Sequence, residues 1–111
     1  MQRDRQPCVY ILASGTRGTL YVGVTSALLQ RLWQHRENVT GGFTARHGVY
    51  RLVHFERFED MERAIAREKR LKNWRRDWKI NLIHAANPDW RDLAVDLGFP
   101  PLLPRAPQSG P

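Results

Sequence analysis

Residues 8 to 25, CVYILASGTRGTLYVGVT, decide the fold of this chain. Segments 8 to 13 and 19 to 24 are rich in the apolar, β-branched and aromatic residues that strands favour, and glycines and polar residues lie between them. The pattern predicts a β-hairpin with Tyr10 on its first strand and Tyr21 on its second. Most tyrosines in such strands are core residues with a bonded hydroxyl, so neither phenol indicates a site by itself.

A helix and a third strand are predicted after the hairpin. Thr25 or Ser26 can cap a helix over SALLQRLWQHREN, residues 26 to 38, in which apolar side chains recur at helical spacing. Residues 39 to 48, VTGGFTARHG, contain three glycines and show no periodicity, which indicates an exposed loop. The alternation in YRLVHFERF, residues 50 to 58, predicts a strand.

Two further helical segments complete the pattern. Residues 60 to 73 and 74 to 86 have helical periodicity, and the pair Asn87-Pro88 ends the second, because a residue before proline avoids helical geometry. The predicted fold class is α+β. A small three-stranded antiparallel sheet, made of the hairpin and the third strand, is flanked by helices in the order β-β-α-β-α-α.

The length and composition indicate one domain. A chain of 111 residues can close one modest core, which we expect over residues 8 to 97, with residues 1 to 7 as an N-terminal extension and the proline-rich residues 98 to 111 as a flexible tail. The single cysteine, Cys8, allows no internal disulfide. No apolar run approaches the roughly 20 residues that cross a bilayer. We therefore expect a cytoplasmic protein without membrane contact.

The positive charge is concentrated in one segment. The formal net charge is +7, and residues 61 to 80 hold eight cations against three acids. Clustered cations release condensed counterions when they neutralise phosphates, so such a segment is typical of nucleic-acid binding. A solvated helix surface is an equally good explanation, and an acidic membrane is a weaker one. The candidate contacts are Lys69, Arg70, Lys72 and Arg75, with Thr44, Arg46 and His47 in the predicted loop, which could also be a solvated connector.

Glu68 interrupts the apolar seam of its own predicted helix. Residues 61, 64, 65 and 71 share its side of that helix, and an inward-facing charge is costly unless it is paired or holds a metal. An ion pair with Lys72, four residues on, would be a purely structural explanation. The residues alone leave both roles open.

Arg31 and His35 lie four residues apart on one flank of the helix predicted at 26 to 38. A guanidinium can hold a phosphate through two hydrogen bonds, and an imidazole can transfer protons near neutral pH. Taken alone, the pair could equally be a solvated helix flank.

Together these residues resemble the GIY-YIG nuclease superfamily, in particular its small single-domain bacterial members, similar to the catalytic module of excision-repair and homing nucleases. The resemblance spans residues 7 to 92 and includes NPDWRDL near its end. Cys8 and Val9 replace the glycine and isoleucine of the first triplet. The motifs that carry it are Cys8-Val9-Tyr10, Tyr21-Val22-Gly23, the run from Gly23 to Ser26 with Arg31 and His35 beyond it, and Glu68 within AREKRLKNW.

The resemblance implies a role for each residue. Tyr10 would help to deprotonate an attacking water, and Tyr21 would orient that water. Arg31 would stabilise the charge that grows on the phosphate oxygens, and His35 would assist proton transfer or hold the phosphate. Glu68 would be the one protein carboxylate on a Mg²⁺ or Mn²⁺ ion that otherwise keeps water and phosphate ligands.

Such sites often use an asparagine after the glutamate as well, and both Asn81 and Asn87 are candidates. Asn87 also has a structural explanation, as the end of a helix before proline, and Asn81 has one as a surface residue.

The predicted function is a metal-dependent endonuclease that hydrolyses DNA, with structured or damaged DNA in repair or recombination as the candidate substrate and RNA left open. The alternative is a non-catalytic nucleic-acid-binding module with the same fold, and a third possibility is a protein-interaction domain. We expect no small-molecule cofactor, and either a monomer or a weak dimer.

Overall fold

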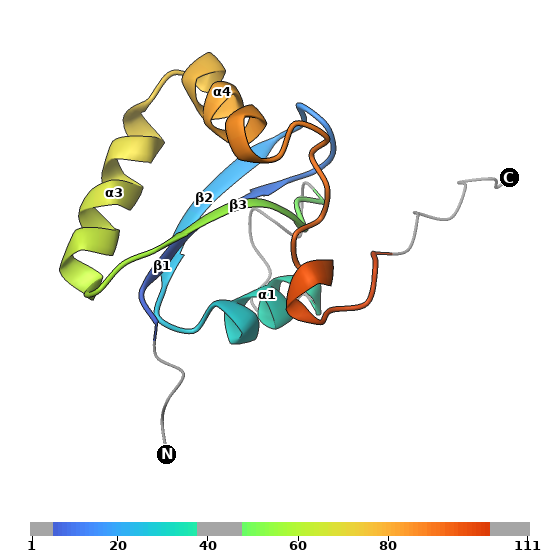
Figure 1. Cartoon of the computed structure of the whole chain (residues 1–111), viewed down its shortest axis with the longest axis horizontal. Coiled ribbons are helices and arrows are strands. Elements are labelled where there is room, and N and C mark those ends of the chain that lie inside the picture. The colour runs from blue at the N-terminus through green and yellow to red at the C-terminus, as the bar shows by residue number, and fades with distance from the viewer. Residues whose placement is uncertain (1–5, 38–47, 103–111) are drawn as a thin grey trace, which may run out of the picture.

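The computed structural model describes residues 6 to 37 and 48 to 102 (Figure 1). The order of its elements confirms the predicted α+β class. They are β1 (Cys8–Ala13), β2 (Leu20–Thr25), α1 (Leu28–Arg36), β3 (Arg51–Arg57), α3 (Met61–Asn73), α4 (Arg76–Ala86) and the 3₁₀ turn η1 (Val95–Leu97). No helix in the described part of the chain is both long and apolar enough to span a membrane.

The predicted cap of α1 is wrong. The helix begins at Leu28, and its N-cap position is Ala27, which makes no side-chain capping bond. Thr25 is still part of β2, paired with Cys8, and its Oγ1 accepts a hydrogen bond from the Ala27 N–H at 3.0 Å. The threonine hydroxyl therefore stabilises the turn into the helix and leaves the helix terminus uncapped.

The three strands form an antiparallel sheet in the order β2-β1-β3, as predicted. Strand β1 is central and is buried along its full length, which explains why its sequence is continuously apolar. Its partners at Tyr10 are Gly23 on β2 and Phe55 on β3. A register shift between Ile11 and Leu12 interrupts the pairing with β3.

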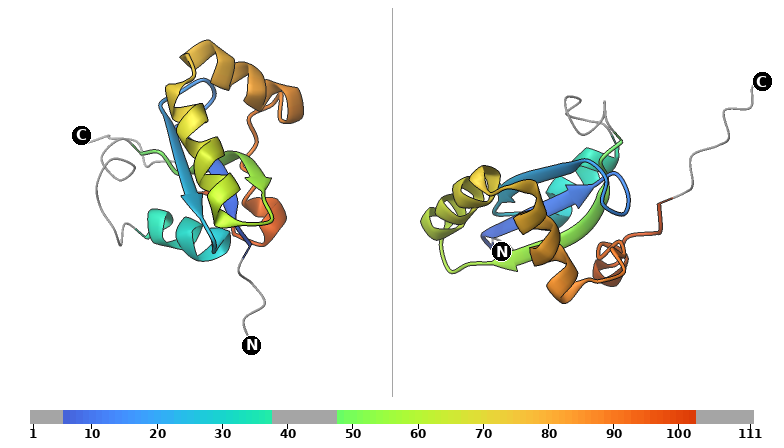
Figure 2. Two further views of the ribbon diagram at one scale, coloured as in Figure 1. Left: turned by 90° about the vertical axis from the view of Figure 1, so that its left-hand side faces the viewer. Right: turned by 90° about the horizontal axis from the view of Figure 1, so that it is seen from above.

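Helices cover both faces of the sheet (Figure 2). Val9, Ile11 and Ala13 face the core cluster that includes residues of α3 and α4. The alternate residues Tyr10 and Leu12 face a second cluster, built with α1 and the segment from 93 to 99. Because successive side chains of a strand point to opposite faces, β1 joins the two clusters.

The first residues of the predicted flexible tail pack against α1. The Arg36 guanidinium lies 5.0 Å from the centre of the Phe99 ring and donates a hydrogen bond to the Pro100 carbonyl at 3.2 Å. Arg36 also pairs with Asp92 at 2.6 Å, which fixes the preceding segment. Residues 103 to 111 of that tail lie outside the described residues.

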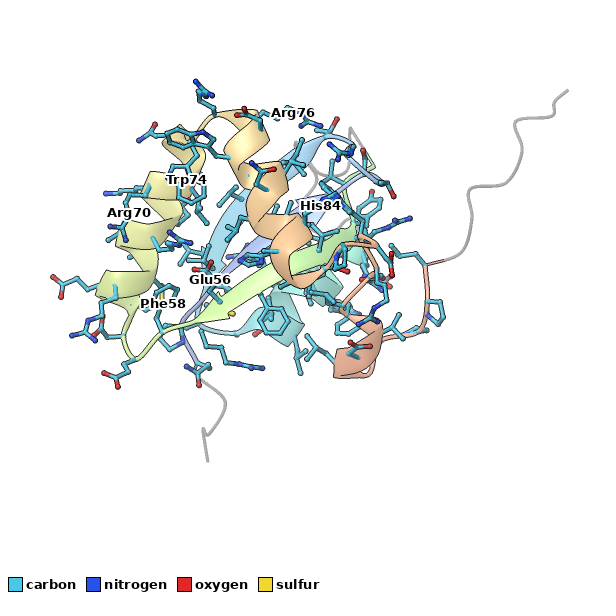
Figure 3. The ribbon with its side chains drawn as sticks, turned by 45° about the horizontal axis from the view of Figure 1, so that its top comes forward. Glu56, Phe58, Arg70, Trp74, Arg76 and His84 are labelled. Carbon is cyan, nitrogen blue, oxygen red and sulfur yellow. The ribbon has the colours of Figure 1, made fainter. Side chains whose placement is uncertain are left out.

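A partly buried ion network attaches α3 to the edge strand β3. Arg67 donates to both carboxylate oxygens of Glu56, at 2.8 and 3.0 Å, and His54 Nε2 lies 2.8 Å from Glu56 Oε2. Figure 3 shows Glu56 on the strand beneath α3. The hydrogen bond from His54, with further help from Arg67 and against the effect of burial, lowers the pKa of Glu56 from 4.5 to about 2.

This network predicts a loss of stability in acid. Because the folded pKa of Glu56 lies below its unfolded value, its contribution is fully present above pH 4.5 and is lost as the pH falls from 4.5 towards 2. We expect wild type to lose on the order of 2 to 3 kcal/mol more unfolding free energy across that range than Glu56→Gln does. Urea unfolding at pH 5.5, 4, 3 and 2.5 measures this difference. Parallel pH profiles for the two proteins would contradict the prediction.

Candidate active site

The phenol of Tyr10 crosses over the edge strand β2 because its partner there is glycine. Tyr10 on β1 pairs with Gly23, and a Cβ atom added at Gly23 would overlap the Cζ and hydroxyl of Tyr10. The missing side chain therefore makes room for the ring. Gly23 is part of the sequence motif, but its role in leaving space for the Tyr10 ring follows only from the strand register.

Replacing Gly23 with alanine is expected to force the Tyr10 ring out of its position. The new methyl group would meet a ring that is buried in a core cluster, so we expect a destabilisation of about 1 to 3 kcal/mol. The matched control is Gly15→Ala, because a Cβ atom at Gly15 has nothing within 4 Å. Chemical denaturation of both variants measures the difference. Equal stabilities would show that the ring can move at little cost.

Tyr10, Tyr21 and His35 form one aromatic cluster. Their ring centroids are 6.3 Å apart between the two tyrosines, 5.9 Å between Tyr10 and His35, and 5.6 Å between Tyr21 and His35. The Tyr10 hydroxyl lies 3.1 Å from His35 Nε2, within hydrogen-bonding distance. The hairpin and α1 thus bring together three of the residues singled out in the sequence.

The protonation states of this cluster suit a hydrogen bond from the phenol to the imidazole. Burial, and to a lesser extent Arg31, lower the pKa of His35 below 6.5, so the ring is neutral at neutral pH and can accept. Burial is also the main reason why the pKa of Tyr10 is raised far above 10. The phenol is therefore protonated and can donate.

Arg31 and Glu68 act on the same phenol. After burial, Tyr21 raises the Tyr10 pKa, Arg31 lowers it, and Glu68 raises it more weakly. All five predicted catalytic residues thus contribute to the Tyr10 ring contacts or to the Tyr10 pKa, and together they form the Tyr10 neighbourhood. Tyr10 and His35 are buried, whereas Tyr21 and Arg31 are partly exposed and form the accessible side of the cluster.

Glu68 is buried on α3 and also forms the ion pair with Lys72 considered in the sequence. Glu68 is 9% exposed, and the Lys72 Nζ atom lies 2.6 Å from the Glu68 Oε2 atom. The Lys72 side chain is 52% exposed, so the amine reaches the carboxylate from solvent. Because the amine approaches from solvent, another cation can take its place, and the buried carboxylate then stays paired.

The donor set fits a hard divalent cation with one protein ligand. Within residues 6 to 37 and 48 to 102, no three His, Cys, Asp or Glu side chains are grouped to hold a metal. Glu68 offers a carboxylate whose ion-pair partner, the Lys72 amine, is half exposed to solvent. Mg²⁺ commonly keeps several waters and binds through one or two carboxylates together with phosphate oxygens.

The predicted nucleic-acid contacts are distributed along α3 and the start of α4. Lys69, Arg70, Lys72 and Arg75 are all exposed, and Figure 3 shows Arg70 on the outer side of α3. The predicted loop contacts Thr44, Arg46 and His47 lie outside the described residues. Asn81 is exposed on α4.

Asn87 has a structural role. It is 4% exposed, and its side-chain nitrogen donates to the carbonyls of Val53 at 3.1 Å and Arg91 at 3.0 Å. Its side-chain oxygen accepts from the Arg91 N–H at 3.0 Å. These bonds attach the end of α4 to β3, so they account for the asparagine without a substrate.

The match to a known family covers most of the chain. The model of the GIY-YIG catalytic domain matches residues 6 to 81, which include all five residues of the Tyr10 neighbourhood. This chain belongs to the GIY-YIG family. The resemblance seen in the sequence is thereby confirmed, and it places the chain in a family of nucleases, whose substrates are nucleic acids.

Two bacterial UPF0213 proteins are similar to this chain, one in sequence and one in structure. A UPF0213 protein of Clostridium perfringens (strain 13 / Type A) is 36% identical over 75 residues, covering 68% of this chain and 80% of that protein. The solution NMR structure of the UPF0213 protein of Bacillus halodurans matches with a TM-score of 0.51 and 25% identity. That match covers 86% of this chain and 99% of the other.

Proposed function

We propose that this protein is a metal-dependent endonuclease that hydrolyses phosphodiester bonds of DNA. The observation that carries the proposal is the hydrogen-bonding contact between the Tyr10 hydroxyl and His35 Nε2, at 3.1 Å, in a neighbourhood that also contains Arg31 and Glu68. Tyr10 and His35 offer a route for a proton. Arg31 offers a cation for the phosphate oxygens, and Glu68 offers a carboxylate for a metal. We infer structured or damaged DNA as the substrate, in repair or recombination.

Tyr10 and His35 together would act as the base. A phenol with a raised pKa is a poor base alone, so Tyr10 would accept a proton from water as its own proton passes to neutral His35. The water oxygen forms a bond to phosphorus, the bond from phosphorus to the leaving oxygen breaks, and that oxygen takes a proton from solvent. Tyr21 would orient the water on the accessible side of the cluster.

Arg31, Glu68 and Lys72 would bind the phosphate side of the substrate. Arg31 would stabilise the negative charge on the phosphate oxygens as the water attacks. Glu68 would hold Mg²⁺ or Mn²⁺, and this metal, when bound, supplies Lewis-acid stabilisation of the same charge. Lys72 would exchange its pair with Glu68 for a phosphate oxygen.

The second candidate function is a non-catalytic nucleic-acid-binding module. The ion pair between Glu68 and Lys72 favours it, because a carboxylate already neutralised by an amine needs no metal. In either case we infer a cytoplasmic monomer or weak dimer that uses no small-molecule cofactor and binds DNA or RNA through its basic helices.

Incubation of the purified chain with labelled single-stranded, nicked, branched and duplex DNA, and with RNA, tests the proposal. Each substrate is tested in EDTA, in Mg²⁺ and in Mn²⁺. We expect cleavage only with metal. Binding without cleavage on every substrate would support the second candidate instead.

A further inference from the structure

The junction between α3 and α4 holds an exposed aromatic side chain inside the most basic segment of the chain. Trp78 is 48% exposed, and its ring meets Trp74 edge to face, with centroids 5.9 Å apart. The Arg75 guanidinium lies 5.2 Å from the centre of the Trp78 ring, and Arg67 lies equally far from that of Trp74. The Trp78 indole is therefore held in place by neighbouring side chains while half of it faces solvent.

We propose that Trp78 is a stacking platform for an unpaired base of single-stranded nucleic acid. Every base presents a π-face to an indole, and an indole that is already ordered loses little further freedom when a base stacks on it. The surrounding cations add attraction to the backbone. The proposal rests on the proposed function in naming nucleic acid as the partner, and it narrows that partner to a single strand.

The charge around the platform supports this choice of partner. Arg75 pairs with Asp77 at 3.4 Å, but both side chains are well exposed, at 70% and 65%, so a phosphate can replace the aspartate at little cost. Two further arginines belong to the same segment: Figure 3 shows Arg70 on α3 before Trp74, and Arg76 at the start of α4. Neutral or basic partners would not use this surplus of arginines.

The platform follows directly on the helix that carries Lys72 and Glu68. These two residues lie near the end of α3, which stops at Asn73, and Trp78 lies in the first turn of α4, which begins at Arg76. A single strand stacked at the junction would therefore pass along α3 towards Lys72 and Glu68. Bases inside a duplex are covered on both faces by their neighbours, so Trp78 has nothing to stack on there except at an end or a flipped base.

Equilibrium binding of the full chain to fluorescent oligonucleotides, in EDTA so that no metal takes part, tests the platform. The probes are oligothymidylate, the same backbone with abasic positions, and a duplex of equal length. We expect Trp78→Ala to weaken binding to oligothymidylate roughly 5- to 100-fold, with little effect on the other two probes. Trp78→Phe keeps a ring and should retain most of the affinity.

The matched control is Trp33→Ala, because Trp33 is 51% exposed but lies on α1, away from the basic segment. We expect this variant to bind all probes as wild type does. Unchanged affinity of Trp78→Ala for oligothymidylate, or an equal loss on duplex, would overturn the platform. If wild type binds none of the probes, the result counts against the proposed function itself. If wild type binds the probes and Trp78→Ala has no effect, the result counts against the platform alone.

Discussion

Glu68→Gln is expected to abolish metal-dependent cleavage while the protein remains folded. Glutamine keeps the size of the buried side chain but removes the charge that would hold a divalent cation. A metal ion stabilises the transition state by several kcal/mol, so we expect the cleavage rate to fall at least about 100-fold. Single-turnover cleavage with saturating protein measures the rate, and circular dichroism checks the fold.

The control for Glu68→Gln is Glu62→Gln, which removes an exposed glutamate from the first turn of the same helix. It changes the net charge by the same amount, so a general electrostatic effect on DNA affinity would be equal in the two variants. Only the Glu68 variant should lose cleavage with binding retained. Cleavage at the wild-type rate by Glu68→Gln would remove the metal site from the proposal.

Tyr10→Phe is expected to slow cleavage about 100- to 10,000-fold, the range for loss of a positioned acid or base. The ring keeps its place over Gly23, but the hydroxyl that faces His35 is gone. We expect a stability cost of only about 1 kcal/mol, because one hydrogen bond is lost. Tyr50→Phe, which alters the one tyrosine outside the cluster, should leave the rate unchanged.

The pH dependence of wild type gives a second measurement on the same pair of residues. The neutral form of His35 is the one that accepts a proton, and its pKa is lowered below 6.5. Activity should therefore be retained down to pH 6.5 and fall only at lower pH, as the ring becomes charged. A rate that already falls between pH 8 and 7 would argue against neutral His35 as the acceptor.

Much of this architecture could be predicted because it depends on local pattern. The strands and helices follow apolar periodicities, and Arg31 and His35 share a flank through their spacing of four. Glu68 was recognisable as a charge on an apolar seam. The sequence left its two explanations open; the structure contains the pair with Lys72, and the metal-binding role stays a prediction.

Features that depend on which strands pair, and in what register, could not be predicted. The need for Gly23 follows from its place opposite Tyr10, and the network of Glu56 with Arg67 joins residues on different elements. Asn87 was a candidate for the site because the resemblance implies an asparagine after the glutamate. Its buried bonds to Val53 and Arg91 could not be seen in the sequence, because they arise only from the tertiary fold. Thr25 and Ser26 were predicted as caps because both have the preferred chemistry, but the strand continues through Thr25.

The position of β1 between two strands has a consequence for how the protein fluctuates. Backbone amides of a central, fully buried strand exchange with deuterium mainly through global unfolding, whereas edges and helix ends open locally. We therefore expect the hydroxyl of Tyr10 to be anchored to a strand whose amides exchange slowly. Local opening of the outer helices would let a nucleic-acid strand enter and leave while the Tyr10 hydroxyl oxygen keeps its position.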